Sequence, residues 1–368
     1  MQMFRAVTGR WARYWHRPGF EVSYFACRLA CVLSLALSVP WSLIGGHGDW
    51  MAGRPADQYK PVGVLCLFGP SPPAAAYFDA CWVAMQVALV TAALGLFTRL
   101  SLLTAFWSFA CLTSLRFSFD VAWSHGQVPQ LLVALALAIG PPHTFTLDDL
   151  IRRVRGRPPL AAERSVSSGV LLGQFTVAWV FANAALYKLF LGNGEPLAWC
   201  YSDNLRNILI LQHWVLAEPL PPMVQFLVDR PWAYKGAAVL NVLCQAGPLV
   251  AIFCSHRPIL RAACGVLIIF EIVGLYVVMG LPNWAWCPLV AFFIDWDRLA
   301  RLIGRRGPSS VSVHPSAEAG GVQSRAPRVR AGDLWLLVFC VAFLWVSLVH
   351  RTQRRYTFHS PLSPCTAP

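Results

Sequence analysis

The chain has 368 residues, of which 57% are hydrophobic and only 13% are charged, and its mean hydropathy is +0.52. Soluble domains carry about 25% charged residues, so this composition excludes an ordinary water-soluble globular protein. The net charge of +13 does not indicate nucleic-acid binding, because no separate basic domain with base-stacking aromatic residues is visible; we interpret the arginines as topological anchors that contact membrane lipids.

The N-terminal segment, residues 1–22, is basic and aromatic. This composition is typical of a helix that lies on a membrane surface. The residues concerned are Arg5, Arg10, Trp11, Arg13, Tyr14, Trp15 and Arg17. No small-residue cleavage site follows the first apolar run, so we expect that run to be a retained signal anchor.

Nine apolar runs predict membrane-spanning helices. They cover residues 24–44, 76–97, 101–119, 128–146, 169–191, 237–254, 259–280, 283–296 and 333–349. The run 283–296 is short and predicts a tilted or half-spanning helix, so the expected number of spans is eight or nine. The predicted fold class is all-α, a polytopic transmembrane helical bundle over residues 23–300. A flexible basic linker at 301–332 and an additional transmembrane helix with its tail at 333–368 follow the bundle.

Arginines are concentrated in alternate connecting segments. The N-terminal segment, 147–168 and 297–331 are rich in arginine, whereas 45–75 and 192–236 hold far fewer basic residues. The positive-inside rule therefore places the N-terminus and the first set in the cytoplasm and the second set outside. We expect a multi-pass protein of the plasma membrane, or of the inner membrane in a bacterial cell.

Most of the twelve cysteines lie inside apolar runs and are interpreted as small packing residues. These include Cys27, Cys31, Cys111, Cys244, Cys264 and Cys340. Because no Cys-x-x-Cys pair or zinc-type Cys/His spacing occurs, no metal site is expected. Cys66 and Cys200 both fall on the predicted outer side, so a disulfide between them is left open.

Ionisable residues inside the spans are candidates for function, because a charge at mid-bilayer costs about 2.5–3.5 kcal/mol on insertion scales. They are Arg28, Asp79, Lys188 and Glu271. A structural interpretation pairs Arg28 with Glu271 in an interhelical ion pair that fixes packing. Asp79 lies near a span end, where a solvated carboxylate is expected.

Lys188 differs from the others because the chain has only three lysines, and this one ends an apolar span in ANAALYKLF. A desolvated lysine loses its proton readily and can act as a base or nucleophile. The alternative is a lysine that snorkels to the membrane interface. His125 enters the fourth span from the same predicted outer face, so we expect His125 and Lys188 to share an outward-opening cavity.

The segment 199–216 is more than a simple loop. Ser202 or Asp203 can cap a helix, and polar residues interrupt the apolar residues that follow. One interpretation is a lid over the cavity, with Trp199 and Arg206 as lid residues. The other is a surface helix without a role.

Four motifs together resemble a known family. They are YFACRLACVLSLAL, LGLFTRLSLLTAF, SHGQVPQLLVALALAIGPPHTFTLDD and FANAALYKLFLGNGEPLAW. In this order they resemble the HTTM (horizontally transferred transmembrane) domain, the membrane domain shared with vitamin K-dependent gamma-carboxylase. The resemblance covers about residues 20–300.

The resemblance implies roles for two residues. Lys188-Leu189 with Trp199 is similar to the pattern around the family's catalytic lysine, and Ser124-His125 is similar to an Asn-His pair of the family. It implies that Lys188 accepts a proton from a reduced quinone, such as vitamin K hydroquinone, and that His125 stabilises the anion that results.

Three classes of function stay open at this point. The first is a carboxylase-like lyase or oxidoreductase that acts on a lipid-soluble quinone or a membrane-proximal substrate. The second is a non-catalytic carrier of a lipid or small molecule, and the third is a membrane-bound maturation factor. Membrane lipids are the expected partners, and the sequence identifies no protein partner.

Overall fold

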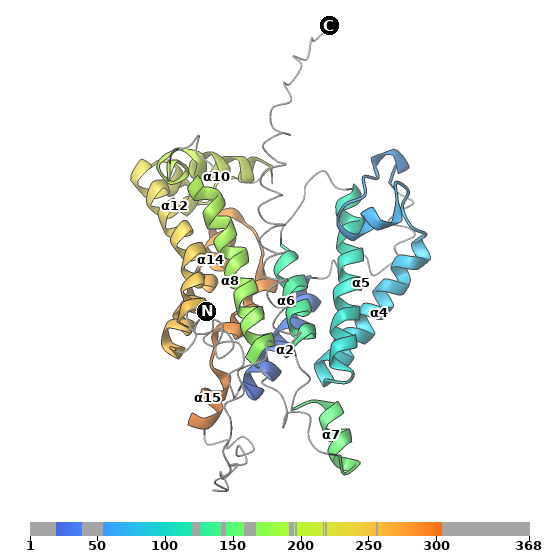
Figure 1. Cartoon of the computed structure of the whole chain (residues 1–368). Coiled ribbons are helices and arrows are strands. Elements are labelled where there is room, and N and C mark those ends of the chain that lie inside the picture. The colour runs from blue at the N-terminus through green and yellow to red at the C-terminus, as the bar shows by residue number, and fades with distance from the viewer. Residues whose placement is uncertain are drawn as a thin grey trace, which may run out of the picture. The chain divides into compact units, whose positions relative to one another are not determined.

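Long apolar runs fold into helices, because only a helix satisfies its own backbone in a bilayer. The protein is described by a computed structural model (Figure 1). It describes residues 20–38, 54–119, 126–140, 145–157, 167–190, 195, 197–215, 217, 219–254 and 257–303. The chain divides into two units: one covers Trp15–Val311 and holds every described residue, and the other combines Met1–Tyr14 with Ser312–Pro368.

Six helices in the described residues are long and apolar enough to cross a membrane. They are α2 (Glu21–Ser38), α4 (Ala75–Leu94), α5 (Thr98–Phe119), α8 (Ser167–Phe190), α14 (Pro258–Met279), and α12 (Pro231–Ala246) continued by η5 (Gly247–Leu249) and α13 (Val250–Phe253). The described ranges contain helices and no strand, which confirms the all-α fold class. The N-terminal segment, the linker and the helix expected at 333–349 lie wholly or almost wholly outside these ranges and stay predictions.

Two further apolar helices are shorter than expected. The run 128–146 gives α6 (Val128–Ile139), which ends at Gly140, and the run 283–296 gives a 3-10 helix, η6 (Trp284–Phe293), with Pro288 inside it. Twelve α-helical residues extend about 18 Å, less than the roughly 30 Å of a bilayer core. The expected count of eight or nine spans is therefore not confirmed, since six helices have the required length and two do not.

Shorter helices connect the long ones. They are η2 (Ala56–Gln58), η3 (Gly63–Phe68), α7 (Leu147–Val154), α9 (Ala198–Tyr201), α10 (Asn204–Val215), α11 (Pro222–Val228) and α15 (Trp296–Leu302). Figure 1 shows α7 and α15 at one end of α8 and α10 at the other. The arginine-rich α7 and α15 thus share one end, as the alternation of basic segments predicts. The assignment of that end to the cytoplasm rests on the positive-inside rule and stays a prediction.

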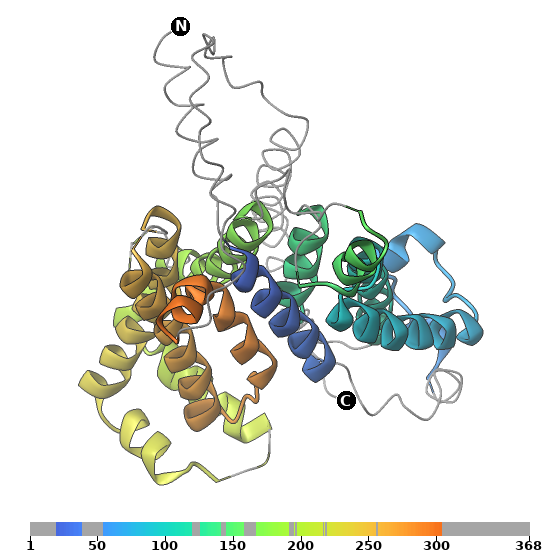
Figure 2. The ribbon, with the colours of Figure 1, turned by 90° about the horizontal axis from the view of Figure 1, so that it is seen from below.

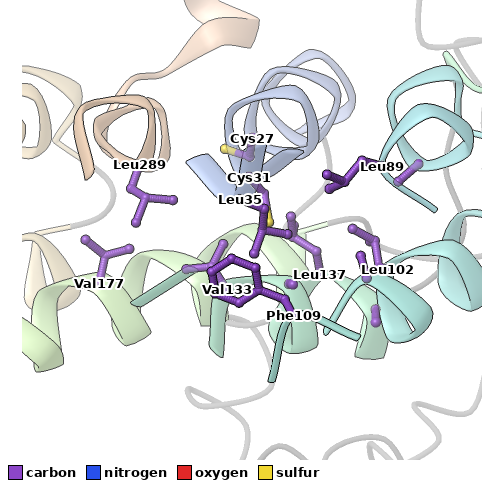
Figure 3. Packing of buried hydrophobic residues seen from close by; sticks show 14 of the residues in the cluster. Cys27, Cys31, Leu35, Leu89, Leu102, Phe109, Val133, Leu137, Val177 and Leu289 are labelled. Atoms are coloured by element: carbon purple, nitrogen blue, oxygen red, sulfur yellow. The ribbon is translucent and has the colours of Figure 1, made fainter. Parts of the chain in front are cut away.

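α2 occupies a central position among the described helices. It packs against η6, α6 and α4, while α6 packs against α5 and α8, and α8 packs against α12. Figure 2 shows α2 between the η6 side and the α4–α5 pair. The buried residues at this junction include Cys27, Cys31, Leu35, Leu89, Leu102, Phe109, Val133, Leu137, Val177 and Leu289 (Figure 3).

The cysteines predicted to be packing residues are buried wherever the structure describes them. Cys27 and Cys31 are fully buried on α2, and Cys111, Cys244 and Cys264 are also buried. This confirms their interpretation as small apolar packing residues. Cys340 lies outside the described residues.

Small residues bring α6 and α8 close together. A Cβ atom placed on Gly140 would lie 3.1 Å from the Cα atom of Gly169. A side chain at Gly140 would press against the Gly169 backbone, so this close approach favours glycine at Gly140, as is common between membrane helices.

The N-terminus of α2 is capped by a residue 275 positions away along the chain. Asp297 on α15 accepts hydrogen bonds from the backbone N–H of Val22 at 3.0 Å and of Ser23 at 3.1 Å. It also accepts one from the Ser23 hydroxyl at 2.6 Å. A carboxylate at this place satisfies otherwise unpaired N–H groups and suits the positive end of the helix dipole.

Asp297→Ala is expected to lower the free energy of unfolding by about 1–2 kcal/mol, the range for loss of a helix N-cap. The thermal unfolding midpoint of the purified protein in detergent measures the effect. Asp57→Ala is the control, because Asp57 is exposed on η2. Equal midpoints for the two variants would show that Asp297 does not stabilise α2.

Candidate functional site: a lysine, amide and carboxylate network

Lys188 lies in the last turn of α8, where it faces α12. Its Nζ donates hydrogen bonds to Asn241 Oδ1 and to Gln245 Oε1, the second at 3.0 Å. Asn241 and Gln245 are four residues apart, so one face of α12 presents both side chains. The lysine is therefore held by two neutral amides and not by a direct ion pair.

Glu271 on α14 completes the network from the other side. Asn241 Nδ2 lies 2.8 Å from each oxygen of the Glu271 carboxylate, and Gln245 Nε2 lies 2.6 Å from Oε1. The oxygens of both amides thus face the ammonium group and their N–H groups face the carboxylate. This arrangement separates a half-buried cation from a buried anion by a layer of amides, and each charge has hydrogen-bond partners.

Trp199 covers the same amine. The Lys188 Nζ lies 4.8 Å from the centre of the Trp199 ring, at a distance typical of a cation–π contact. Trp199 belongs to α9, which packs against α8 and α12. One of the two expected lid residues is therefore in contact with the lysine.

Cys200 lies beside this contact in a small apolar cluster with Ala185, Ala238 and Val242. Burial raises the pKa of the Cys200 thiol above its ordinary value. A raised pKa keeps the thiol neutral at physiological pH, so Cys200 is a packing residue rather than a nucleophile.

Helix α10, which holds most of the rest of the segment 199–216, packs on α11, α12 and α14. The Tyr234 hydroxyl donates to Asp203 Oδ1, and Arg206 Nε donates to the carbonyl of Val228 at 3.3 Å. Arg206, the second expected lid residue, ties α10 to α11. A lid movement of the whole segment stays a prediction.

The structure does not pair Arg28 with Glu271. Arg28 is fully buried on α2, where it donates to the carbonyls of Phe145 at 3.1 Å and Ala93 at 3.4 Å. The expectation of an interhelical ion pair between them was wrong, because each charge is met by nearer polar groups: backbone carbonyls for Arg28 and the α12 amides for Glu271. Asp79 is exposed near the beginning of α4, as its position near a span end suggests.

His125 lies outside the described residues, so its approach to Lys188 stays a prediction. The next residue, Gly126, is described, and its carbonyl accepts a hydrogen bond from Trp286 Nε1 at 2.7 Å. The Trp286 ring in turn packs edge-on against Phe181, two turns before Lys188 on α8. The start of α6 is thus linked to α8 through one tryptophan.

The disulfide left open between Cys66 and Cys200 is not formed. Both are free cysteines; Cys66 is exposed on η3, and Cys200 is buried on α9. η3 packs against α5, whereas α9 packs against α8, α10 and α12, so the two thiols belong to different neighbourhoods.

Asn241 and Gln245 are the site residues that inspection of the sequence missed. The search for ionisable side chains passed over neutral amides. The signal was present nonetheless: two amides stand four residues apart inside the apolar run 237–254, where an unpaired amide is costly.

Neither a protein-family model, nor a curated protein, nor a solved structure matches the chain.

Proposed function

We propose that this multi-pass membrane protein is an HTTM-like enzyme in which Lys188 accepts a proton from a membrane-soluble substrate of the hydroquinone class. The chain itself is a helical protein with several helices suited to a membrane. The observation that carries the proposal is the pair of amide oxygens that holds the Lys188 amine. The substrate class comes from the resemblance of the motifs around Lys188.

The geometry suits a lysine that changes its protonation state. A neutral amine keeps two N–H groups, enough to serve the oxygens of both Asn241 and Gln245. Its lone pair then occupies the position of the nitrogen that neither amide uses. Loss of the proton therefore leaves neither amide oxygen unpaired, and the same two bonds orient the base.

Glu271 supplies the driving force in this proposal. Its carboxylate is fixed by the two amides on the far side from the lysine. A nearby negative charge stabilises the protonated amine, so Glu271 assists Lys188 in accepting the proton. Trp199 offers a flat apolar surface beside the amine, which fits a substrate with an aromatic ring.

A carrier and a maturation factor remain the alternatives. Both use the same cluster without proton transfer, as a buried polar network that fixes α8, α12 and α14 together. The enzyme proposal differs from them in one property, since it requires a group that exchanges a proton and not merely a cation.

Lys188→Arg tests this property, because arginine keeps the positive charge but does not release its proton near neutral pH. The measurement is the rate of oxygen-dependent oxidation of a naphthohydroquinone by the protein in nanodiscs, over a range of pH. We expect the variant to lose about 10²–10⁴-fold of the protein-dependent rate, the usual contribution of a general base.

Lys60→Arg is the matched control, because Lys60 is exposed and far along the chain from the network. It should leave the rate unchanged. A Lys188→Arg protein with normal rate and normal thermal stability would make Lys188 a structural residue. A wild-type protein that retains a phospholipid on purification but binds no hydroquinone would favour the carrier.

A further inference from the structure

Helix α10 lies at the opposite end of α8 from α7 and α15 (Figure 1), and α11 packs against it. The inner side of this helix pair is buried and apolar, with Leu209 of α10 in one cluster with Val224 and Val228 of α11. The outer side is largely apolar as well. Its exposed apolar side chains are Ile208, Leu211 and Trp214 on α10 and Met223 and Phe226 on α11. A helix pair that is apolar on both sides is poorly suited to water on either of them.

Charged side chains are nearly absent from these two helices. Apart from His213, Arg206 is their one ionisable residue, and its Nε donates to the carbonyl of Val228 at 3.3 Å. The exposed face of α10 begins with the amides of Asn204 and Asn207 and is apolar from the next residue onward. The polar part of this face is therefore confined to the beginning of the helix.

Two contacts fix the level at which the pair lies. His213 Nε2 lies 3.3 Å from the carbonyl oxygen of Val278, in the last turn of the apolar helix α14. The Phe226 ring packs against the ring of Trp232, with centroids 5.9 Å apart, at the beginning of α12. Both short helices are thus level with the ends of two helices that are long enough to span a membrane. This is the level of the membrane–water interface, where tryptophan is enriched.

Neither helix is long enough to cross the bilayer. The twelve residues of α10 extend about 18 Å and the seven of α11 about 10 Å, whereas the hydrocarbon core is about 30 Å thick. A short helix at the interface with an exposed apolar face enters one leaflet only.

We propose that α10 and α11 form a hairpin inserted in one leaflet of the bilayer, with their exposed apolar side chains in contact with phospholipid. Phospholipid fits this face better than a protein partner does, because the face lies level with the ends of α12 and α14. Those helices expose apolar side chains of their own, such as Leu240 and Val277. The proposal needs no chemistry at Lys188, and it places part of the expected outer segment 192–236 in the membrane.

The experiment replaces Leu211 in the full chain by the photoreactive residue p-benzoylphenylalanine, in nanodiscs of phosphatidylcholine. After irradiation, mass spectrometry of the intact protein detects lipid that has become attached. We expect the mass of one phospholipid to be added, as for the same replacement at Leu240, and no addition for Glu195, which is exposed and charged. Absence of the adduct at Leu211 would overturn the proposal, as would attachment to a protein in place of lipid when cell membranes are irradiated.

A substitution gives a second test that needs no photochemistry. Leu211→Asp should lower the thermal unfolding midpoint in nanodiscs by about 2–4 °C, because a carboxylate is poorly accommodated among acyl chains. Asn207→Asp is the matched control, since it adds the same charge one turn earlier, at the polar beginning of the exposed face. It should leave the midpoint unchanged. An unchanged midpoint for Leu211→Asp would mean that this face lies in water, where an exposed leucine is replaced at little cost.

Discussion

Glu271→Leu is expected to lower the free energy of unfolding by about 3–5 kcal/mol, the usual cost of removing one partner of a buried charged network. The variant leaves the half-buried Lys188 without its counter-charge and leaves the N–H groups of Asn241 and Gln245 without the carboxylate that now accepts from them. Denaturant unfolding in detergent, followed by tryptophan fluorescence, measures the loss.

The control is Glu195→Leu, the same replacement at an exposed glutamate that follows α8. It should change stability by less than about 0.5 kcal/mol. The double variant Lys188→Met with Glu271→Leu should lose less than the sum of the two single variants, because it removes both charges together. Strict additivity would mean that the amide layer does not couple the two charges.

Gly173→Ala should also destabilise the protein, although alanine favours helices. A Cβ atom at Gly173 on α8 would lie 2.2 Å from Cε1 of Phe292 on η6. The Phe292 ring is fully buried and has little room to move. Overpacking of this kind costs about 1–3 kcal/mol, and we expect a lower thermal midpoint.

Gly236→Ala is the matched control for this effect. Gly236 also lies in a long helix, α12, but a Cβ atom there would meet nothing within 4 Å. Alanine at that position should be neutral or should stabilise by about 0.5–1 kcal/mol through its helix propensity. If both variants shifted the midpoint equally, the close contact of α8 with η6 would not limit stability.

The apolar runs of the sequence located the long helices well. Six of the nine predicted spans correspond to long helices, because a run of about 20 apolar residues has few alternatives to a membrane helix. The helices predicted from two other runs, 128–146 and 283–296, were longer than the helices that form. Composition does not show that Gly140 ends α6 or that the backbone around Pro288 tightens into a 3-10 helix.

The candidate site was predicted in part. Lys188 was singled out by the rarity of lysine, and Trp199 by its place in the motif, and the structure brings the two into contact. The partner of Glu271 was not predicted correctly, because sequence patterns give the charges within helices but not which helix faces which. Amides that lie between two charges can hydrogen-bond to both of them, so the charges need not touch. A search for opposite charges in direct contact therefore does not find the amides.

The short helix α6 has a consequence for how the chain enters the membrane during synthesis. A helix of twelve residues is too short to leave a translocon alone as a stable span, since insertion scales sum over about 19 residues. Its packing partners α2 and α5 precede it in the chain, but α8, which meets it at Gly169, is synthesised later. Biogenesis of this region is therefore expected to be cooperative, with α6 reaching its final depth only after α8 has entered the bilayer.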